Sequence, residues 1–151
     1  MVLPHYRSRE FDWTSFEAMR NCAGMAYEMA GIKNPREEID LAEVHDCFSI
    51  TELCIYEDFG FSPRGGAPRD IEEGFFERTG GLPVNVDGGL KCFGHPVGAS
   101  GIRMTYEVYK QLQGKVDNPA RQLKNVSRGL SQTFGGPPQI AACMIIGNEK
   151  G

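Results

Sequence analysis

The chain has 151 residues, of which 40% are hydrophobic and 24% charged, which is enough for one ordinary core and too few for two. A net charge of -4, without any run of lysine and arginine, excludes the charge pattern expected of a nucleic-acid-binding protein. No stretch approaches the ~18 apolar residues of a membrane span, and the first ten residues lack the apolar run of a secretory signal. The last three residues are not the Ser-Lys-Leu signal of peroxisomal proteins. We therefore expect a cytoplasmic protein.

The first half of the chain alternates helical and strand patterns. Apolar residues recur every three or four positions over residues 15–30, which predicts a helix that ends at Gly31. After the turn at 34–35, residues 39–44 favour a strand that leads into His45. A capping box, Ser49-x-x-Glu52, then predicts a helix from Ser49 to about Gly60.

The second half is richer in glycine. After a loop at 61–69, Asp70 and Glu73 fit the cap of a short helix through residue 78. Residues 82–86 predict a short strand before a glycine-rich loop at 88–101. The next helix should bury one face, formed by Ile102, Val108, Tyr109 and Leu112. Residues 122–127 and 140–146 predict strands around a turn at 135–138, and the last strand, apolar on both faces, should be central in the sheet.

His95 is the first candidate for chemistry. It lies between Gly94 and Pro96, and a residue before proline is held in extended geometry. An imidazole with restricted backbone freedom suits proton transfer at neutral pH. The spacing is equally compatible with a histidine that only hydrogen-bonds within a turn.

His45 and Cys47 would share one side of an extended segment at the end of a strand, where α/β folds bind ligands. The ordinary alternative for Cys47 is a small core residue. A zinc site formed with Cys92 and His95 lacks the CxxC pairs of structural sites, so no metal is expected. The segment 133–138 either aims a backbone N–H at an oxyanion or is a plain hairpin turn.

These residues together resemble the thiolase family. The segment GGLKCFGHPVGASG at 88–101 looks like the GHP motif of that family, and His95 is the residue that matches its catalytic histidine. The segment His45-Asp-Cys-Phe48 resembles the variant found in the sterol-carrier-protein type of thiolase, whose cysteine takes over acid/base work. The family's Cys-x-Gly motif aligns with Thr133 and Gly135, and a threonine does not replace a thiol as base.

The resemblance implies an α/β fold, one thiolase-like half with a mixed five-stranded sheet and helices on both faces. Residues 1–19 would be a connector and residues 20–151 the thiolase C-terminal domain. The catalytic residues would be His95, Cys47, His45 and Gly135, and the substrate-binding residues Phe48, Gly94 and Pro96.

By the same resemblance the substrate is a coenzyme A thioester, with no bound cofactor. The family's nucleophilic cysteine has no counterpart here, so the chain either works beside an N-terminal half or subunit as partner, or is a fragment or a degenerate gene product. Exposed apolar helix faces are expected where the missing half would pack. A zinc-ribbon and OB-fold acyl-CoA-binding protein is a further expected partner, and the assembly should be oligomeric. Two alternatives remain: a thiolase-like retro-aldolase subunit acting on a bulky acyl-CoA, and a non-catalytic subunit that completes a partner's fold.

Overall fold

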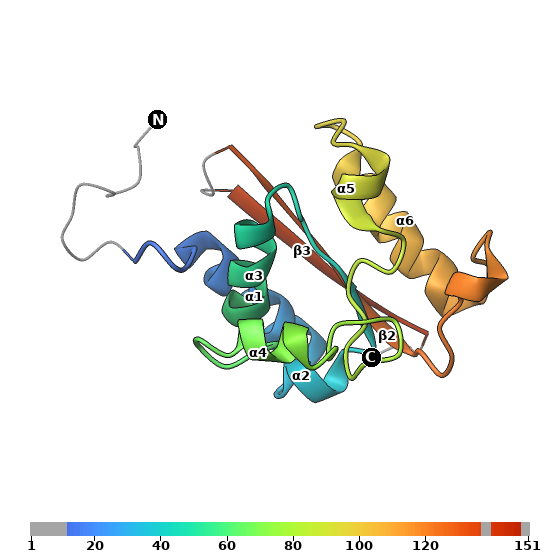
Figure 1. The fold of residues 1–151 in the computed structure, drawn as a ribbon, viewed down its shortest axis with the longest axis horizontal. Helices are drawn as coiled ribbons and strands as arrows, with labels where there is room; N and C mark the ends of the chain where they lie inside the picture. The colour runs from blue at the N-terminus through green and yellow to red at the C-terminus, as the bar shows by residue number, and fades with distance from the viewer. Residues whose placement is uncertain (1–11, 137–139, 149–151) are drawn as a thin grey trace.

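The computed structural model describes residues 12–136 and 140–148 and has an α/β architecture (Figure 1). Strands β1 (Leu41–Glu43), β2 (Arg128–Gly135) and β3 (Ile140–Gly147) form one sheet in the order β1-β2-β3. β1 runs parallel to β2, and β2 runs antiparallel to β3. The predicted α/β class with a mixed sheet is confirmed. The predicted five strands are wrong for the described residues, where the only further pairing is a bridge between Ala42 and Val84.

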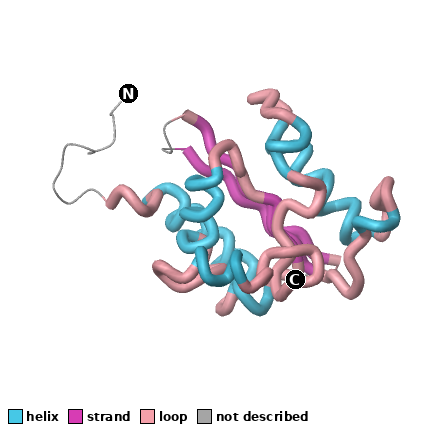
Figure 2. The backbone as a smooth tube through the Cα atoms, viewed as in Figure 1, coloured by secondary structure: helices cyan, strands magenta, loops and turns pink. Residues whose placement is uncertain are grey.

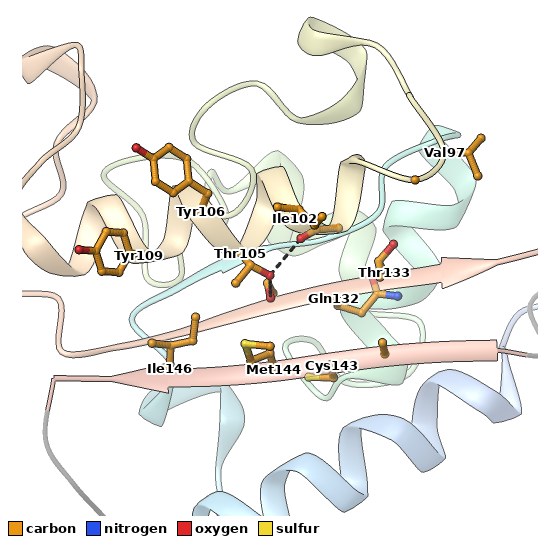
Figure 3. A pocket seen from close by; sticks show the side chains of 14 residues that line it. Val97, Ile102, Thr105, Tyr106, Tyr109, Gln132, Thr133, Cys143, Met144 and Ile146 are labelled. Carbon is orange, nitrogen blue, oxygen red and sulfur yellow. Dashed lines mark hydrogen bonds between the residues drawn. The ribbon is translucent and has the colours of Figure 1, made fainter.

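Two long helices cover the sheet. Helix α1 (Glu17–Ala30) packs against β3, and helix α6 (Ser100–Gln113) packs against β2 on the other side (Figures 1 and 3). The shorter helices lie in the connections (Figure 2), namely α2 (Pro35–Glu38), α3 (Ser49–Asp58), α4 (Ala67–Glu72), α5 (Gly89–Phe93) and the 3-10 turn η1 (Pro119–Arg121).

Strand alternation divides the core between the two faces. Ala42 and Val44 join the larger cluster, which lies with α1 and α3, whereas Leu41 joins a smaller cluster with Val108 and Leu112 of α6. Glu43 and His45 have the same parity as Leu41, so this alternation directs them toward α6. β1 and the residues that follow it thus place Ala42 and Val44 on one face of the sheet, and the titratable side chains of Glu43 and His45 on the other.

The predicted end of the first helix and the predicted start of the helix after β1 are confirmed, but the predicted capping of the latter is not. α1 ends at Gly31, whose φ of 69° is the left-handed geometry expected there. α3 begins at Ser49 as predicted, but no side chain caps it. The carboxylate of Glu52 instead accepts hydrogen bonds from Tyr56 and Asn85. The capping-box prediction is therefore wrong, because tertiary partners outcompete the local backbone for this carboxylate.

The short-helix prediction beginning at Asp70 is also wrong. α4 ends at Glu72, and Asp70 is inside it, buried, where it binds the guanidinium of Arg36 and the hydroxyl of Ser62. The cause is the same as at Glu52: a carboxylate that could cap its own helix forms an ion pair with a distant segment instead.

Three further predictions fail in the second half of the chain. The strand expected at 122–127 begins only at Arg128, and β3 lies at the edge of the sheet instead of in its centre. In α6, Val108 and Leu112 are buried as predicted, but the side chains of Ile102 and Tyr109 are 73% and 43% exposed. β3 and α6 therefore carry more apolar side chains than the described chain buries. Part of the predicted turn, 137–139, lies outside the described residues.

No helix of the described chain is both long and apolar enough to cross a membrane.

Candidate functional site

A cavity of about 620 Å³ opens beyond the carboxyl end of β1, where β1 gives way to α3. Its walls come from four segments that are far apart in the sequence. The lining residues are Phe16, His45, Asp46, Cys47, Phe48, Thr51, Leu90, Lys91, His95, Val97, Phe134, Gly135 and Gly136. The predicted residues His45, Cys47, Phe48, His95 and Gly135 thus meet around one open cavity, whereas Gly94 and Pro96 flank His95 without lining it.

His45 is buried and held from three sides. Its backbone N–H donates to the side-chain oxygen of Gln132 at 3.1 Å, and its Nδ1 lies 3.2 Å from the hydroxyl of Thr133. The ring of Phe134 lies against it, with centroids 4.3 Å apart. Burial, and then the nearby imidazole of His95, lower the pKa of His45, so the neutral ring is favoured. A neutral imidazole in this place can donate one hydrogen bond without bringing in a charge.

His95 faces His45 across the cavity. The two rings meet edge to face with centroids 4.7 Å apart. Nδ1 of His95 lies 2.8 Å from the hydroxyl of Ser100, at the start of α6. This contact fixes the orientation of the ring through Nδ1. The other nitrogen, Nε2, takes no part in the contact with Ser100, and a histidine that transfers protons requires this arrangement.

Cys47 is half-buried at the cavity wall, with its sulfur 3.9 Å from the hydroxyl of Thr51. The side chain of Phe48 is 69% exposed beside it, at the N-terminus of α3. The alternative of Cys47 as an enclosed core residue does not fit this position, because its side chain reaches the cavity.

The sequence reasoning missed Asp46. This residue is buried, and its carboxylate accepts a hydrogen bond of 2.7 Å from the backbone N–H of Leu90, in the first turn of α5. Gly89 approaches the same carboxylate so closely that a Cβ there would lie 2.4 Å from an oxygen. Asp46 thus ties the segment that bears His95 to the end of β1. In the sequence, only its position between His45 and Cys47 could have indicated this role of Asp46.

Thr133, Ser100 and Phe134 were also not recognised for the contacts they make. Thr133 occupies the position aligned with the family's second cysteine, and here its hydroxyl supports His45. Gly135 is the last residue of β2, paired with Ile140, so 133–135 belong to a strand instead of a turn. Within residues 12–136 and 140–148, no group of three or more His, Cys, Asp or Glu side chains is arranged to hold a metal ion.

A second, mainly apolar groove of about 720 Å³ lies between α6 and the strands β2 and β3. Val97 lines both cavities, so the groove adjoins the site described above. Figure 3 shows Ile102, Tyr106 and Tyr109 on the α6 side and Cys143, Met144 and Ile146 on the strand side. The expected exposed apolar faces are therefore present.

Comparison with known proteins identifies the family. Residues 4–148 match the thiolase C-terminal domain-like family, and the chain belongs to it. It is 42% identical to an acetyl-CoA acetyltransferase of Methanothermobacter thermautotrophicus, over 89% of this chain and 34% of that protein. It is 33% identical to sterol carrier protein 2 of Homo sapiens, over 80% of this chain and 21% of that protein.

Among solved structures, the chain resembles one called "Ltp2-ChsH2(DUF35) aldolase", with a TM-score of 0.77 and 26% identity, covering 97% of this chain and 35% of that one. The chain thus spans between 21% and 35% of the length of these relatives. The sequence resemblance to the sterol-carrier-protein type of thiolase is confirmed.

Proposed function

We propose that this chain is the C-terminal part or subunit of a thiolase that cleaves or forms the carbon–carbon bond of a 3-oxoacyl-CoA. The single observation that supports this most is the convergence of His45, Cys47 and His95 on one cavity. The family and the acetyl-CoA acetyltransferase relative support the acyl-transfer class.

In the proposed cleavage a cysteine from the rest of the enzyme loses its proton to His95 and attacks the 3-oxo carbon. The carbon–carbon bond breaks, and the acetyl-CoA enolate takes a proton from the thiol of Cys47. Free coenzyme A then gives its proton to the Cys47 thiolate and attacks the acyl-enzyme thioester. The attacking cysteine leaves and regains its proton from His95, so one 3-oxoacyl-CoA and one coenzyme A give two acyl-CoA molecules.

His45, His95 and the N–H of Gly135 would stabilise the oxyanions of these steps, because all three lie at the cavity. The lowered pKa of His45 suits this role, since a neutral imidazole stabilises an oxyanion by donating a hydrogen bond without transferring its proton. Phe48, with Gly94 and Pro96 beside His95, would contact the substrate.

The groove along α6 would receive the rest of the thiolase, whether on the same polypeptide or on another. It is apolar, it adjoins the His95 cavity at Val97, and the relatives are about three times as long as this chain. A segment seated there would reach the cavity from the Val97 end and bring the nucleophile beside His95. Further partners, including a zinc-ribbon and OB-fold acyl-CoA-binding protein, and an oligomeric assembly are part of the proposal.

A retro-aldolase acting on a bulky acyl-CoA is the second candidate, because the solved neighbour is called an aldolase. The two reactions differ in stoichiometry. Thiolysis consumes one free coenzyme A per bond broken, whereas a retro-aldol cleavage of a 3-hydroxyacyl-CoA releases an aldehyde or ketone and consumes none.

The test is to recover the tagged chain with its partner from native cells and to assay the complex with acetoacetyl-CoA, with and without free coenzyme A. Thiolysis that depends on coenzyme A, and that falls by about 10²-fold or more on Cys47→Ala, is expected. Cys92→Ala is the control, because Cys92 is exposed outside the cavity lining. Cleavage of a 3-hydroxyacyl-CoA without coenzyme A would favour the aldolase, and a captured protein that yields neither activity would favour a non-catalytic subunit.

A further inference from the structure

Arg103, in the first turns of α6, contacts three other segments at once. Its guanidinium forms an ion pair with Asp87, in the loop before α5. It lies over the ring of Phe93, the last residue of α5, at 5.0 Å from the ring centroid. It also lies 3.9 Å from the carboxylate of Glu43 on β1. One side chain thus joins β1, α6 and both ends of α5.

α5 is only five residues long, so besides the buried Leu90 and the ion pair of Lys91 with Glu52, its placement depends on contacts at its two ends. At its start, Asp87 accepts the N–H of Gly89 at 2.8 Å and Asp46 accepts the N–H of Leu90 at 2.7 Å. Arg103 fixes the first of these carboxylates and covers Phe93 at the other end. Only Gly94 separates Phe93 from His95, so the placement of α5 determines where the His95 ring enters the cavity.

The contact with Glu43 explains why an arginine is needed at this position. Glu43 is completely buried, and neither carboxylate oxygen has a well-formed hydrogen bond in the described chain. A planar guanidinium can serve Asp87 with one nitrogen, lie near Glu43 with another, and stack on Phe93 with its face. The point charge of a lysine could not make all three contacts.

We propose that Arg103 is a positioning residue that holds α5, and through it the imidazole of His95, against His45. Its significance for catalysis rests on the proposed thiolase function, but the positioning itself does not. The proposal can therefore be tested on the chain alone, without any turnover.

The experiment is NMR of the imidazole protons, which is favourable because the chain has only three histidines. In the native chain we expect a nuclear Overhauser effect between the rings of His45 and His95, and a pKa of His45 below its ordinary value of 6.5. Arg103→Gln should abolish the ring-to-ring effect. It should also move the pKa of His45 up toward 6.5, because both the burial and the repulsion by His95 decrease.

Arg121→Gln is the matched control, because Arg121 has nearly the same side-chain exposure, 24% against 22%, and pairs with Glu107 away from α5. It should leave both histidine signals unchanged even if it lowers the melting temperature. Arg103→Lys should give intermediate values.

If Arg103→Gln does not fold, Asp87→Asn decides by the same two signals, because it removes the charge that pairs with Arg103 and keeps a side-chain oxygen that can accept the N–H of Gly89. A folded Arg103→Gln chain, or in its absence a folded Asp87→Asn chain, with the native ring-to-ring effect and the native pKa of His45 would overturn the proposal. Loss of both signals would support it whether or not thiolysis is ever observed.

Discussion

Glu43 is a completely buried acid whose protonation affects the stability of the fold. Burial raises its pKa to about 8 from an ordinary value of 4.5, although Arg103 acts in the opposite direction. The stability contributed by the neutral form is fully present below pH 4.5, because folded and unfolded chains are then both protonated. It is lost as pH rises to about 8, since the unfolded chain ionises first.

Glu43→Gln should therefore remove much of the decline in stability between pH 5 and pH 9. At pH 9 we expect the melting temperature to rise by about 4–8 °C, which corresponds to about 2 kcal/mol for a domain of this size. At pH 4.5 the difference should be small. Thermal unfolding by circular dichroism across this range measures the effect, and exposed Glu72→Gln is the control. Equal melting temperatures of the native chain and Glu43→Gln at pH 9 would contradict the burial argument.

His45 gives a pH dependence in the opposite direction. Its lowered pKa means that folding favours the neutral ring, so this contribution is present above pH 6.5 and is lost as pH falls through the lowered value. His45→Asn keeps a polar side chain that does not titrate. In this variant the free energy of unfolding should depend less on pH in the acidic range. Urea unfolding at pH 5 and pH 7 measures this, and a profile as steep as that of the native chain would show that His45 is not the group responsible.

The residues of the site were predictable to different degrees. His95, His45 and Cys47 were found because they stand in short motifs whose residue types imply chemistry. Asp46 and Thr133 were not assigned their roles, because each acts through a partner more than 40 residues away, Leu90 and His45 respectively. Sequence spacing cannot reveal such contacts, because they form only where distant segments lie side by side in the fold.

At the level of elements, the packing of α6 on the sheet depends on a glycine. A Cβ on Gly129 would lie 2.5 Å from a methyl of Val108 and 2.9 Å from one of Leu41. Gly129→Ala should therefore destabilise the chain by about 1–3 kcal/mol in urea unfolding, because the helix must move away from β2. Gly24→Ala is the contrast, since Gly24 is exposed in the middle of α1 with no atom within 4 Å of its added Cβ. It should stabilise by about 0.5–1 kcal/mol. Equal effects of the two substitutions would refute the close-packing argument.

Long, periodic elements were predictable, and short or tertiary-determined ones were not. α1 has a clear helical period and a glycine end signal, and it was placed correctly. α5 was expected to be loop, because it begins with glycines at its N-cap and first position, and because the carboxylates of Asp46 and Asp87 hold its first turn. β2 was placed too early, since 122–127 and 128–135 are similarly apolar and only the pairing with β1 and β3 distinguishes them.

For the whole molecule, the most informative error is the position of β3. A strand with Ile140 and Met144 at 73% and 52% exposure has the composition of a covered strand, yet it lies at the edge of this sheet. The groove beside it combines this strand with the exposed face of α6. The proposed function gives one explanation for both features: the exposed apolar side chains would pack against the rest of a larger thiolase, and the acetyl-CoA acetyltransferase relative is matched over only 34% of its length.

The last prediction tests that explanation. Ile102→Glu should leave the melting temperature of the isolated chain almost unchanged, because the side chain is 73% exposed. It should nevertheless abolish co-purification with the partner and the associated thiolysis, since a charge in the middle of an apolar interface is costly to desolvate. Met29→Glu is the matched control: Met29 is 88% exposed on α1, across the sheet from the groove. If both variants bind the partner equally well, the groove along α6 is not the interface; if only Met29→Glu binds, the exposed apolar face of α6 is the surface that joins this chain to the rest of the enzyme.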